Sequence, residues 1–492
     1  MSTTTPATVP VAGSPDLMAR LRGALHSAGY TTEALRGLLR ARGELGLRPL
    51  EVQVYERRTR DGSRLATVVR LFALGLAVRE DDAASAFEPI TLAELVDLGL
   101  VTVRAGQVLP LVRLVVHGDF AIAHDLIEVG GANHVPGISG PPTLLAGLAV
   151  RRPVERMLDL GAGNGIQGLL AARHSRHVVC TDINPRALAY TKFNAALNGV
   201  GNLETRLGSL YEPVVGERFG LILANPPYVI SPESRLVYRD SGRRPGELCR
   251  DVVRGAGPHL DADGYAQVLV SWPMASERRW DEPLRAWLPS DVDAWLLHYQ
   301  TEDQLTHAAK WNQSFDDAGI REREQILDDW VRYYQQEGID AIGFGAIFLH
   351  RRPGAGRVFV SEGRSGVAGA GHQVQRVFAA IATGELSDEQ LIGTVFRPVL
   401  EMRLEQIAQP GPDGTWALGQ CVARLTEGVG CEGTLDSTLA TVLSSMDGNV
   451  TLDAAVAAAA DQLGVDRDEL LAPAVAMARG LYELGFLDRQ IS

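Results

Sequence analysis

The stretch Phe219-Gly220-Leu221-Ile222-Leu223-Ala224-Asn225-Pro226-Pro227-Tyr228 decides the fold of this chain. Its apolar first part predicts a buried strand. The two prolines end that strand and prevent a helix, because proline has no N–H and a fixed φ. The chain must therefore leave the sheet in a rigid turn. That turn lies at the carboxyl end of a strand, the edge at which open α/β sheets bind ligands.

The proline turn places two hydrogen-bond acceptors at this edge, the side-chain oxygen of Asn225 and the main-chain carbonyl of Pro226. Two acceptors suit the two hydrogens of a planar –NH2 group. Tyr228 can cover the face of the same planar group. We therefore predict a catalytic site for an amide or a nucleobase amine, formed by Asn225, Pro226, Pro227 and Tyr228.

A second group of motifs lies upstream. Residues 156–161 predict a short strand, and Gly161-Ala162-Gly163-Asn164-Gly165 a tight turn before a helix. Glycines permit such a turn and let a ligand approach the main chain. The next predicted strand, residues 177–182, ends at Asp182, whose carboxylate can accept both ribose hydroxyls of a nucleoside. A glycine-rich turn alone also fits the binding of NAD or FAD. Its combination with the proline turn narrows the choice of cofactor class.

Together these motifs resemble the class I S-adenosylmethionine-dependent methyltransferases. Within that class the chain is similar to the amino-methylating branch, which includes release-factor glutamine N5-methyltransferases and adenine N6-methyltransferases. The resemblance spans about Val129 to Arg352. It implies an α/β fold with a Rossmann-like, seven-stranded core, S-adenosylmethionine as the cofactor, and a target amine bound by Asn225 and stacked on Tyr228. The residues it implies for cofactor binding are Asp159, Gly161, Gly163, Gly165, Asp182, Ser209, Asn225 and Thr143.

Two of these positions need separate comment. Ser209 follows the predicted strand 203–207 and stands where the family usually has an acid that accepts from the adenine amino group. Serine can accept a hydrogen bond there only without charge assistance, so we expect a weaker adenine contact or another group in its place. Thr143 ends a proline-containing stretch from His134 that often closes over the cofactor in family members. A plain turn before a helix explains this stretch equally well.

Composition sets the wider bounds. The 492 residues are enough for two to four domains, and 46% hydrophobic and 22% charged residues are typical of a globular protein. No apolar run approaches the length of a membrane span, so we expect no membrane partner and a cytoplasmic location. The net charge of −13 argues mildly against duplex nucleic acid as the main partner.

No metal site is expected. The four cysteines have no C-x-x-C spacing, and the histidines are scattered along the chain. His117, His124 and His134 come close together before the core, but their spacing matches no metal-ligand pattern. We interpret these three histidines as incidental.

The chain divides into four predicted segments. Residues 1–13 form a tail, and residues 14–110 form a helical, winged-helix-like domain with helix caps at Ser14 and Thr32. Residues 111–353 form the methyltransferase domain, which begins with a hairpin (111–117 and 120–124) and contains a charged helical insertion at 301–338. Residues 372–492 form a second mainly helical, winged-helix-like domain, which lacks a basic recognition helix and so favours protein contacts over DNA. Further core strands are predicted at residues 266–271, 292–299 and 342–350.

Three classes of function fit these observations. The favoured one is an N-methyltransferase that acts on a macromolecule, with a protein glutamine side chain as the acceptor. The second is a methyltransferase for a nucleic-acid base amine, adenine N6 or guanine N2, with a flipped base in the same slot. The third is a non-catalytic scaffold that keeps the cofactor fold, against which Asn225 and Tyr228 argue. A small-molecule acceptor stays open, and the sequence does not fix the oligomeric state.

Overall fold

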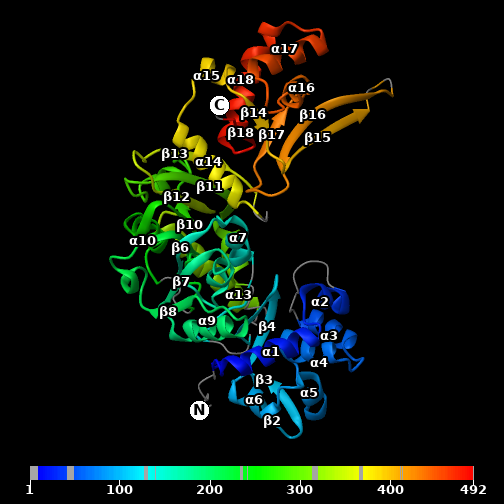
Figure 1. Cartoon of the computed structure of the whole chain (residues 1–492). Helices are drawn as coiled ribbons and strands as arrows, with labels where there is room; N and C mark the ends of the chain where they lie inside the picture. The colour runs from blue at the N-terminus through cyan, green and yellow to red at the C-terminus, as the bar shows by residue number, and fades with distance from the viewer. Residues whose placement is uncertain are drawn as a thin grey trace. The chain divides into compact units, whose positions relative to one another are not determined.

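The computed structural model describes residues 9–40, 49–126, 131–138, 140–232, 236–240, 242–312, 320–364, 369–410, 412 and 414–490. Residues 1–8 of the predicted tail and residues 313–319 of the predicted insertion lie outside the described residues. The chain forms two compact units, and Figure 1 labels many of their elements. The first combines residues 1–142 with 153–244, and the second combines residues 143–152 with 245–492.

The first unit begins with a small, mainly helical part. It contains α1 (Pro15–Ser27), α2 (Thr32–Leu39), α3 (Pro49–Arg58), α4 (Arg64–Val68), the π-helical turn η1 (Val69–Ala73), α5 (Glu80–Phe87) and α6 (Leu92–Asp97), and the antiparallel strands β1 (Val78–Arg79), β2 (Val101–Arg104) and β3 (Gln107–Pro110). Ser14 caps α1, as predicted, by accepting from the main-chain N–H of Leu17. The predicted cap at Thr32 is wrong by one residue, because the neighbouring Thr31 caps α2.

The predicted hairpin that follows is confirmed as β4 (Val112–His117) and β5 (Phe120–Asp125). The edge of β5 is covered by helix α9 (Pro185–Leu197). The side-chain amides of Asn194 and Asn198 each exchange two hydrogen bonds with the main chain of β5, at Ala123 and Ala121. They thereby satisfy the groups of an edge strand as a neighbouring strand would.

The apolar core of the N-terminal part is also shared with α9. Buried side chains of α1 and η1 belong to the same cluster as buried side chains of α9, among them Leu21, Phe72, Tyr190 and Phe193. Arg22 adds a hydrogen bond from its guanidinium to the carbonyl of Leu197, at the last turn of α9. The helix that follows the predicted cofactor acid is thus packed into the N-terminal part.

The first unit also holds the parallel strands of the main sheet. They are β6 (Val154–Leu160), β7 (Ser175–Asp182), β8 (Leu203–Leu207) and β9 (Phe219–Ala224), in the spatial order β9-β6-β7-β8. Helix α8 (Ile166–Ala171) and the 3-10 turn η2 (Glu212–Val214) lie between them in the chain. Every residue of β9 is buried, as its apolar sequence predicts.

Within the described residues the sheet has eight strands, in the order β13-β11-β12-β10-β9-β6-β7-β8. The second unit contributes β10 (Leu260–Met274), β11 (Asp293–Asp303), β12 (Ala341–His350) and β13 (Val358–Glu362). Strand β12 is antiparallel to both β10 and β11, which confirms the predicted α/β, Rossmann-like fold. The predicted number of seven strands is wrong by one. Strand β13 follows the turn at 353–356 and pairs parallel to β11, where Trp295 donates to the Ser361 hydroxyl.

The other helices of the sheet region are α7 (Gly140–Leu148), α10 (Glu247–His259), α11 (Glu282–Arg285), α12 (Gln304–Trp311) and α13 (Ile320–Gln336). The C-terminal part contains α14 (Gly371–Thr383), α15 (Asp388–Ile392), α16 (Ser437–Ser444), α17 (Leu452–Leu463) and α18 (Arg467–Glu483). It also contains β14 (Phe396–Pro398), β15 (Met402–Pro410), β16 (Trp416–Leu425), β17 (Glu432–Leu435) and β18 (Leu487–Arg489).

The sequence predicted a mainly helical, winged-helix-like domain for the C-terminal part. The structure adds a three-stranded antiparallel sheet, β15-β16-β17, whose long β15–β16 hairpin is orange in Figure 1. None of the helices in the described ranges combines the length and the apolar character that a membrane span requires.

Candidate functional site

The glycine-rich turn between β6 and α8 depends on glycine at three positions. Gly161, Gly163 and Gly165 have φ values of 77°, 58° and 87°, a region that other residues rarely adopt. A Cβ added at Gly161 or Gly163 would meet no atom of the described residues within 4 Å. At Gly165 it would lie 2.8 Å from Cγ2 of Thr191. The first two glycines therefore leave the main chain accessible to a ligand, whereas the third permits close packing on α9.

Asp182 ends β7 beside this turn. One carboxylate oxygen accepts from the main-chain N–H of Gly163 at 2.9 Å, and the other accepts from Asn184 N at 2.8 Å. Burial raises the pKa of this carboxyl, and the main-chain donors oppose that rise. The apolar side chains of Ile183 and Leu207 beside it are each 60% exposed. An oriented acid next to exposed apolar surface suits the ribose and the flat base of a nucleoside.

Asp159, which the sequence predicted as a cofactor-binding residue, is buried below the glycine-rich turn. It is 2% exposed, and its carboxylate accepts from Gly168 N at 2.8 Å. Burial raises the pKa of Asp159 to about 7, helped by the neighbouring Asp182. On these contacts Asp159 fixes the first turn of α8, and with it the glycine-rich turn.

The proline turn, residues 225–228, is the second predicted part of the site. Pro226 is buried, Asn225 and Tyr228 are partly buried, and the turn follows β9 directly. The Asn225 Oδ1 atom is buried and has no hydrogen-bond partner within the part of the chain that the structure describes. Leaving a buried acceptor unpaired costs about 1–3 kcal/mol, so this atom is suited to receive an N–H from a ligand.

A returning loop closes the proline turn. Val229 forms a bridge with Asp240, and Val229 N donates to the carbonyl of Arg239 at 3.3 Å. The buried Asp240 carboxylate accepts from Arg239, Ser231 and Leu236 N. The start and the end of this polar loop are therefore tied together directly behind Tyr228.

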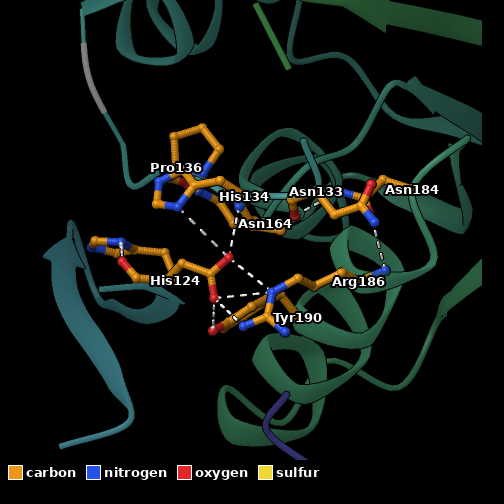
Figure 2. A network of polar contacts seen from close by, with 10 residues as sticks. His124, Asn133, His134, Pro136, Asn164, Asn184, Arg186 and Tyr190 are labelled. Carbon is orange, nitrogen blue, oxygen red and sulfur yellow. Dashed lines mark hydrogen bonds and ion pairs between the residues drawn. The ribbon is translucent and has the colours of Figure 1, made fainter. Parts of the chain in front are cut away.

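Residues 131–138, here called the bridging loop, connect the two cofactor turns. The carbonyl of Pro136 accepts from the Asn164 side chain in the glycine-rich turn, at 3.1 Å. The carbonyl of Asn133 accepts from the Asn184 side chain, two residues after Asp182, at 3.0 Å (Figure 2). The carbonyl of Ala132 accepts from Val237 N, in the loop behind the proline turn.

Asp125, at the end of β5, holds the bridging loop in place. Its buried carboxylate accepts from Val135 N at 2.8 Å, from Tyr190 Oη at 2.6 Å, and from Arg186 through two guanidinium nitrogens. His134 Nδ1 lies 3.9 Å from the same carboxylate. Burial alone raises the pKa of Asp125, but the hydrogen bonds from Arg186, Tyr190 and Val135 bring that pKa below its ordinary value.

Ser209 and Thr143 differ in their surroundings from the other predicted site residues. Ser209 N donates to the carboxylate of Glu212 at 3.3 Å, so an acid three residues further on lies at the Ser209 main chain. Thr143 is exposed on α7 and belongs to the second unit. The structure thus brings together the glycines, Asp159 and Asp182, whereas it gives Thr143 no described contact with them.

Several residues of the site were missed by sequence reasoning: Asp125, Asn164, Asn184, Arg186, Tyr190 and Glu212. Asn164 stands within the quoted glycine-rich turn, and Asn184, a helix N-cap before Pro185, has a local sequence signal. Asp125, in contrast, lies 61 positions from Arg186 and 65 positions from Tyr190 in the chain. His134 was interpreted as incidental but lies in the bridging loop. Within the described ranges, no three His, Cys, Asp or Glu side chains are grouped as metal ligands.

A mixed, mostly parallel sheet with a glycine-rich turn and an acid after the next strand is a Rossmann-like nucleotide-binding arrangement. Residues 139–274 match the family model of the methyltransferase small domain, and residues 27–111 match the Domain of unknown function (DUF7059). The class inferred from the motifs is therefore confirmed for the central segment.

Curated relatives agree with this class. The release factor glutamine methyltransferase of Cereibacter sphaeroides is 39% identical over 130 residues, which cover 24% of this chain and 46% of that protein. The ribosomal protein uL3 glutamine methyltransferase of Bradyrhizobium diazoefficiens is 34% identical over 134 residues, which cover 24% of this chain and 42% of that protein. The chain thus spans about half the length of the curated relatives it matches.

Among solved structures, an rRNA methylase from Streptococcus thermophilus is similar to this chain with a TM-score of 0.26 and 16% identity. The match covers 44% of this chain and 99% of the other. Trm5b from Pyrococcus abyssi gives a TM-score of 0.30 and 15% identity over 51% of this chain and 62% of the other.

The raised pKa of Asp159 predicts a pH dependence of stability. In the folded protein Asp159 keeps its proton up to about pH 7, whereas the unfolded chain releases it near the ordinary value of 3.8. Folding therefore takes up a proton between these values, and the free energy of unfolding falls as the pH rises from about 4 to about 7. Asp159→Asn keeps an acceptor for Gly168 N but cannot ionise, so its free energy of unfolding should fall less, by on the order of 1–4 kcal/mol.

Urea unfolding at several pH values measures this difference. Glu155→Gln, at the exposed start of the same strand, is the matched control and should follow the wild-type curve. If Asp159→Asn also follows the wild-type curve, Asp159 does not titrate in this window.

Proposed function

We propose that the protein is an S-adenosylmethionine-dependent N-methyltransferase whose acceptor is a planar amide nitrogen, that of a protein glutamine side chain. One observation carries the proposal: within the described residues the buried Asn225 Oδ1 atom has no hydrogen-bond partner, and it lies directly after the carboxyl end of β9. An acceptor held there matches one N–H of the target –NH2 group, and the Pro226 carbonyl matches the other. Tyr228 would stack on the face of the same group.

The residues present fit the proposed cofactor. Gly161 and Gly163 leave main chain open to a ligand, and Gly165 keeps the turn packed against α9. Asp182 would accept from the ribose hydroxyls, while Asp159 would hold the turn in shape. Asn225 would line the cofactor's reactive end, and Ser209 would lie near the base. Thr143 is the least supported of these assignments, since it is exposed on α7.

When bound, the cofactor supplies a methyl group already activated by a sulfonium. The chain's own residues then need to orient a poor nucleophile, because the lone pair of an amide nitrogen is delocalised. Hydrogen bonds from the –NH2 group to Asn225 and Pro226 favour a pyramidal nitrogen. They strengthen as positive charge develops there, so they stabilise the transition state more than the ground state. The rigid proline turn keeps both acceptors in place without reorganisation.

Protein glutamine is the acceptor we favour, for two reasons. The relatives named above are glutamine methyltransferases whose names specify protein substrates. In addition, the net charge of −13 disfavours a long nucleic-acid contact. A cytoplasmic location follows if the target resembles those of the relatives. We also infer that residues 111–353 form the catalytic segment, to which residues 14–110 and 372–492 add further parts of the chain.

Substitution of Asn225 tests the acceptor slot. Asn225→Ala should lower turnover by roughly a hundredfold, about 3 kcal/mol in the barrier, because one acceptor for the developing charge is lost. Its affinity for S-adenosylhomocysteine, measured by calorimetry, should stay near the wild-type value. Asp182→Ala should show the opposite pattern, with a clear loss of cofactor affinity. Unchanged turnover in Asn225→Ala would remove the amine slot from the mechanism.

The acceptor class can be tested without knowing the substrate. Purified protein and tritium-labelled S-adenosylmethionine are added to a cell extract that lacks this protein, and the product is then treated with protease or nuclease. We expect acid-precipitable label that is lost on protease treatment only, and mass spectrometry should place it on a glutamine. Label lost on nuclease treatment would favour a base amine, and label that survives both would favour a small molecule. With no label at all, the scaffold interpretation would replace the enzyme.

Glu212 is the residue we expect to take over the adenine contact. Gly208 N donates to the carbonyl of Asp182 at 3.1 Å, which brings the turn 208–212 beside the proposed ribose acid. Within that turn, Glu212 N donates to the Ser209 carbonyl and Ser209 N donates back to the Glu212 carboxylate. A carboxylate thus lies where a serine replaces the acid usual in the resembled family.

A cofactor product with a different base tests whether Glu212 accepts a hydrogen bond from adenine or only contributes negative charge near the base. A carboxylate accepts from the amino group of adenine but repels the carbonyl oxygen of hypoxanthine. The wild type should therefore bind S-adenosylhomocysteine at least about tenfold more tightly than S-inosylhomocysteine, the range expected for one charged hydrogen bond. In Glu212→Gln the ratio should fall toward one, because an amide can also donate. Adding Ser209→Asp should restore it, and an unchanged ratio in Glu212→Gln would leave the base to another residue.

A further inference from the structure

The N-terminal part of the first unit, which matches a domain of unknown function over residues 27–111, is packed into the cofactor region. Its α1 and η1 share a buried core with α9, the helix that follows Asp182. The hairpin β4–β5, which follows the matched segment, is bonded to α9 along its edge by Asn194 and Asn198. Asn194 also donates to the Asn164 carbonyl, within the glycine-rich turn. The N-terminal part thus reaches the proposed cofactor site through α9.

The end of β5 reaches it by a second route. Asp125 is 1% exposed and binds groups from two other segments: Arg186 and Tyr190 on α9, and Val135 N in the bridging loop. Asp125 N also donates to the Val135 carbonyl, so the loop is held by two main-chain contacts there. An unpaired buried carboxylate is strongly unfavourable, so these partners cannot move independently of one another.

The neighbouring His124 fixes the loop by shape. Its Nδ1 atom lies 2.8 Å from the Asp125 carbonyl, which orients the imidazole ring. The ring lies against Gly137, where an added Cβ would come within 2.7 Å of His124 Nε2. No side chain larger than hydrogen fits at Gly137 without displacing the ring or the loop. Figure 2 shows His124 on one side of this loop, with Arg186, Tyr190 and Asn164 on the other.

The loop held in this way carries the two carbonyls that bind the cofactor turns. Pro136 O accepts from Asn164 in the glycine-rich turn, and Asn133 O accepts from Asn184 next to the ribose acid. Both amides lie at the walls of the proposed cofactor site, and both are oriented by carbonyls of the same loop (Figure 2). A shift of the loop would therefore release both walls together.

We propose that the β4–β5 hairpin, which shares a buried core with the N-terminal part, is a built-in clamp for the cofactor site, and that Asp125 is its positioning residue. By holding the bridging loop against α9, Asp125 keeps the glycine-rich turn and the Asp182 turn in their binding geometry before the cofactor arrives. This preorganisation lowers the ordering cost of binding. The inference rests on the proposed function, since it assumes that S-adenosylmethionine binds between these turns. It assigns the N-terminal part the role of supporting this hairpin, in place of an independent nucleic-acid or protein reader.

Three variants test the clamp, with S-adenosylhomocysteine as the probe and calorimetry as the readout. Asp125→Asn loses the charge that binds Arg186, and Gly137→Ala disturbs the fit to His124 while leaving the ion pair intact. Both should bind the probe about tenfold or more weakly, because a displaced loop misplaces the groups it orients. Asp119→Asn, on the turn of the same hairpin with a side chain 85% exposed, is the matched control and should bind as the wild type does.

The binding stoichiometry distinguishes positioning from simple destabilisation. A substitution that only unfolds part of the sample lowers the number of sites per chain but leaves the Kd of the folded remainder unchanged. The clamp predicts a raised Kd with about one site per chain. In the probe-free variants, hydrogen exchange should also become faster at residues 131–138 and 161–165. When the probe is bound, exchange at these residues should become slower again.

The outcomes separate the two proposals. If the wild type does not bind S-adenosylhomocysteine, the proposed function fails. If the wild type binds it and the folded Asp125→Asn and Gly137→Ala proteins bind it equally well, the clamp alone is overturned. Should Asp125→Asn fail to fold, Gly137→Ala decides by itself, since it introduces no unpaired charge.

Discussion

The buried Asp125 carboxylate is the constraint on which the cofactor region depends. A charge removed from water must be compensated by well-placed partners, and here they come from segments that are distant in the chain: Arg186 and Tyr190 on α9, and Val135 in the bridging loop. Because a single carboxylate satisfies all of them, the position of the β4–β5 hairpin fixes both other segments. The contacts around Asp125 also position the two turns that would hold a nucleoside, because Asn164 and Asn184 in these turns are hydrogen-bonded to the bridging loop.

The turns themselves are fixed locally. Positive φ values at Gly161, Gly163 and Gly165 allow the main chain to turn sharply, and Asp159 and Asp182 accept from main-chain N–H groups that the turn exposes. Such features are encoded by neighbouring residues, which is why the strand, the glycine-rich turn and the acid were predicted at the right positions. The same holds for the proline turn, since two prolines after an apolar run leave few alternatives.

Several residues that sequence reasoning missed have partners that are far away in the chain. Asp125 and Arg186 are 61 positions apart, so no spacing rule connects them. Strand β15 was missed because almost all of it is exposed, so its sequence shows no alternation of buried and exposed positions. The error at Thr32 arose because two adjacent threonines are equally good caps by composition. Strand β13 was not predicted, because it lies just beyond a glycine-rich turn and outside the four predicted segments.

The edge of β5 bears on what the N-terminal part can do. A short hairpin with an open edge can recruit a strand from a partner, as many binding modules do. Here that edge is already bonded to the side-chain amides of Asn194 and Asn198, and its apolar face is buried against α9. The main-chain groups of this edge and its apolar face, which a binding module would offer to a partner, therefore already make contacts within the chain. Because this surface is used for contacts within the chain, a role inside the molecule is favoured. The nearest feature that the hairpin can influence is the loop that joins the two cofactor turns.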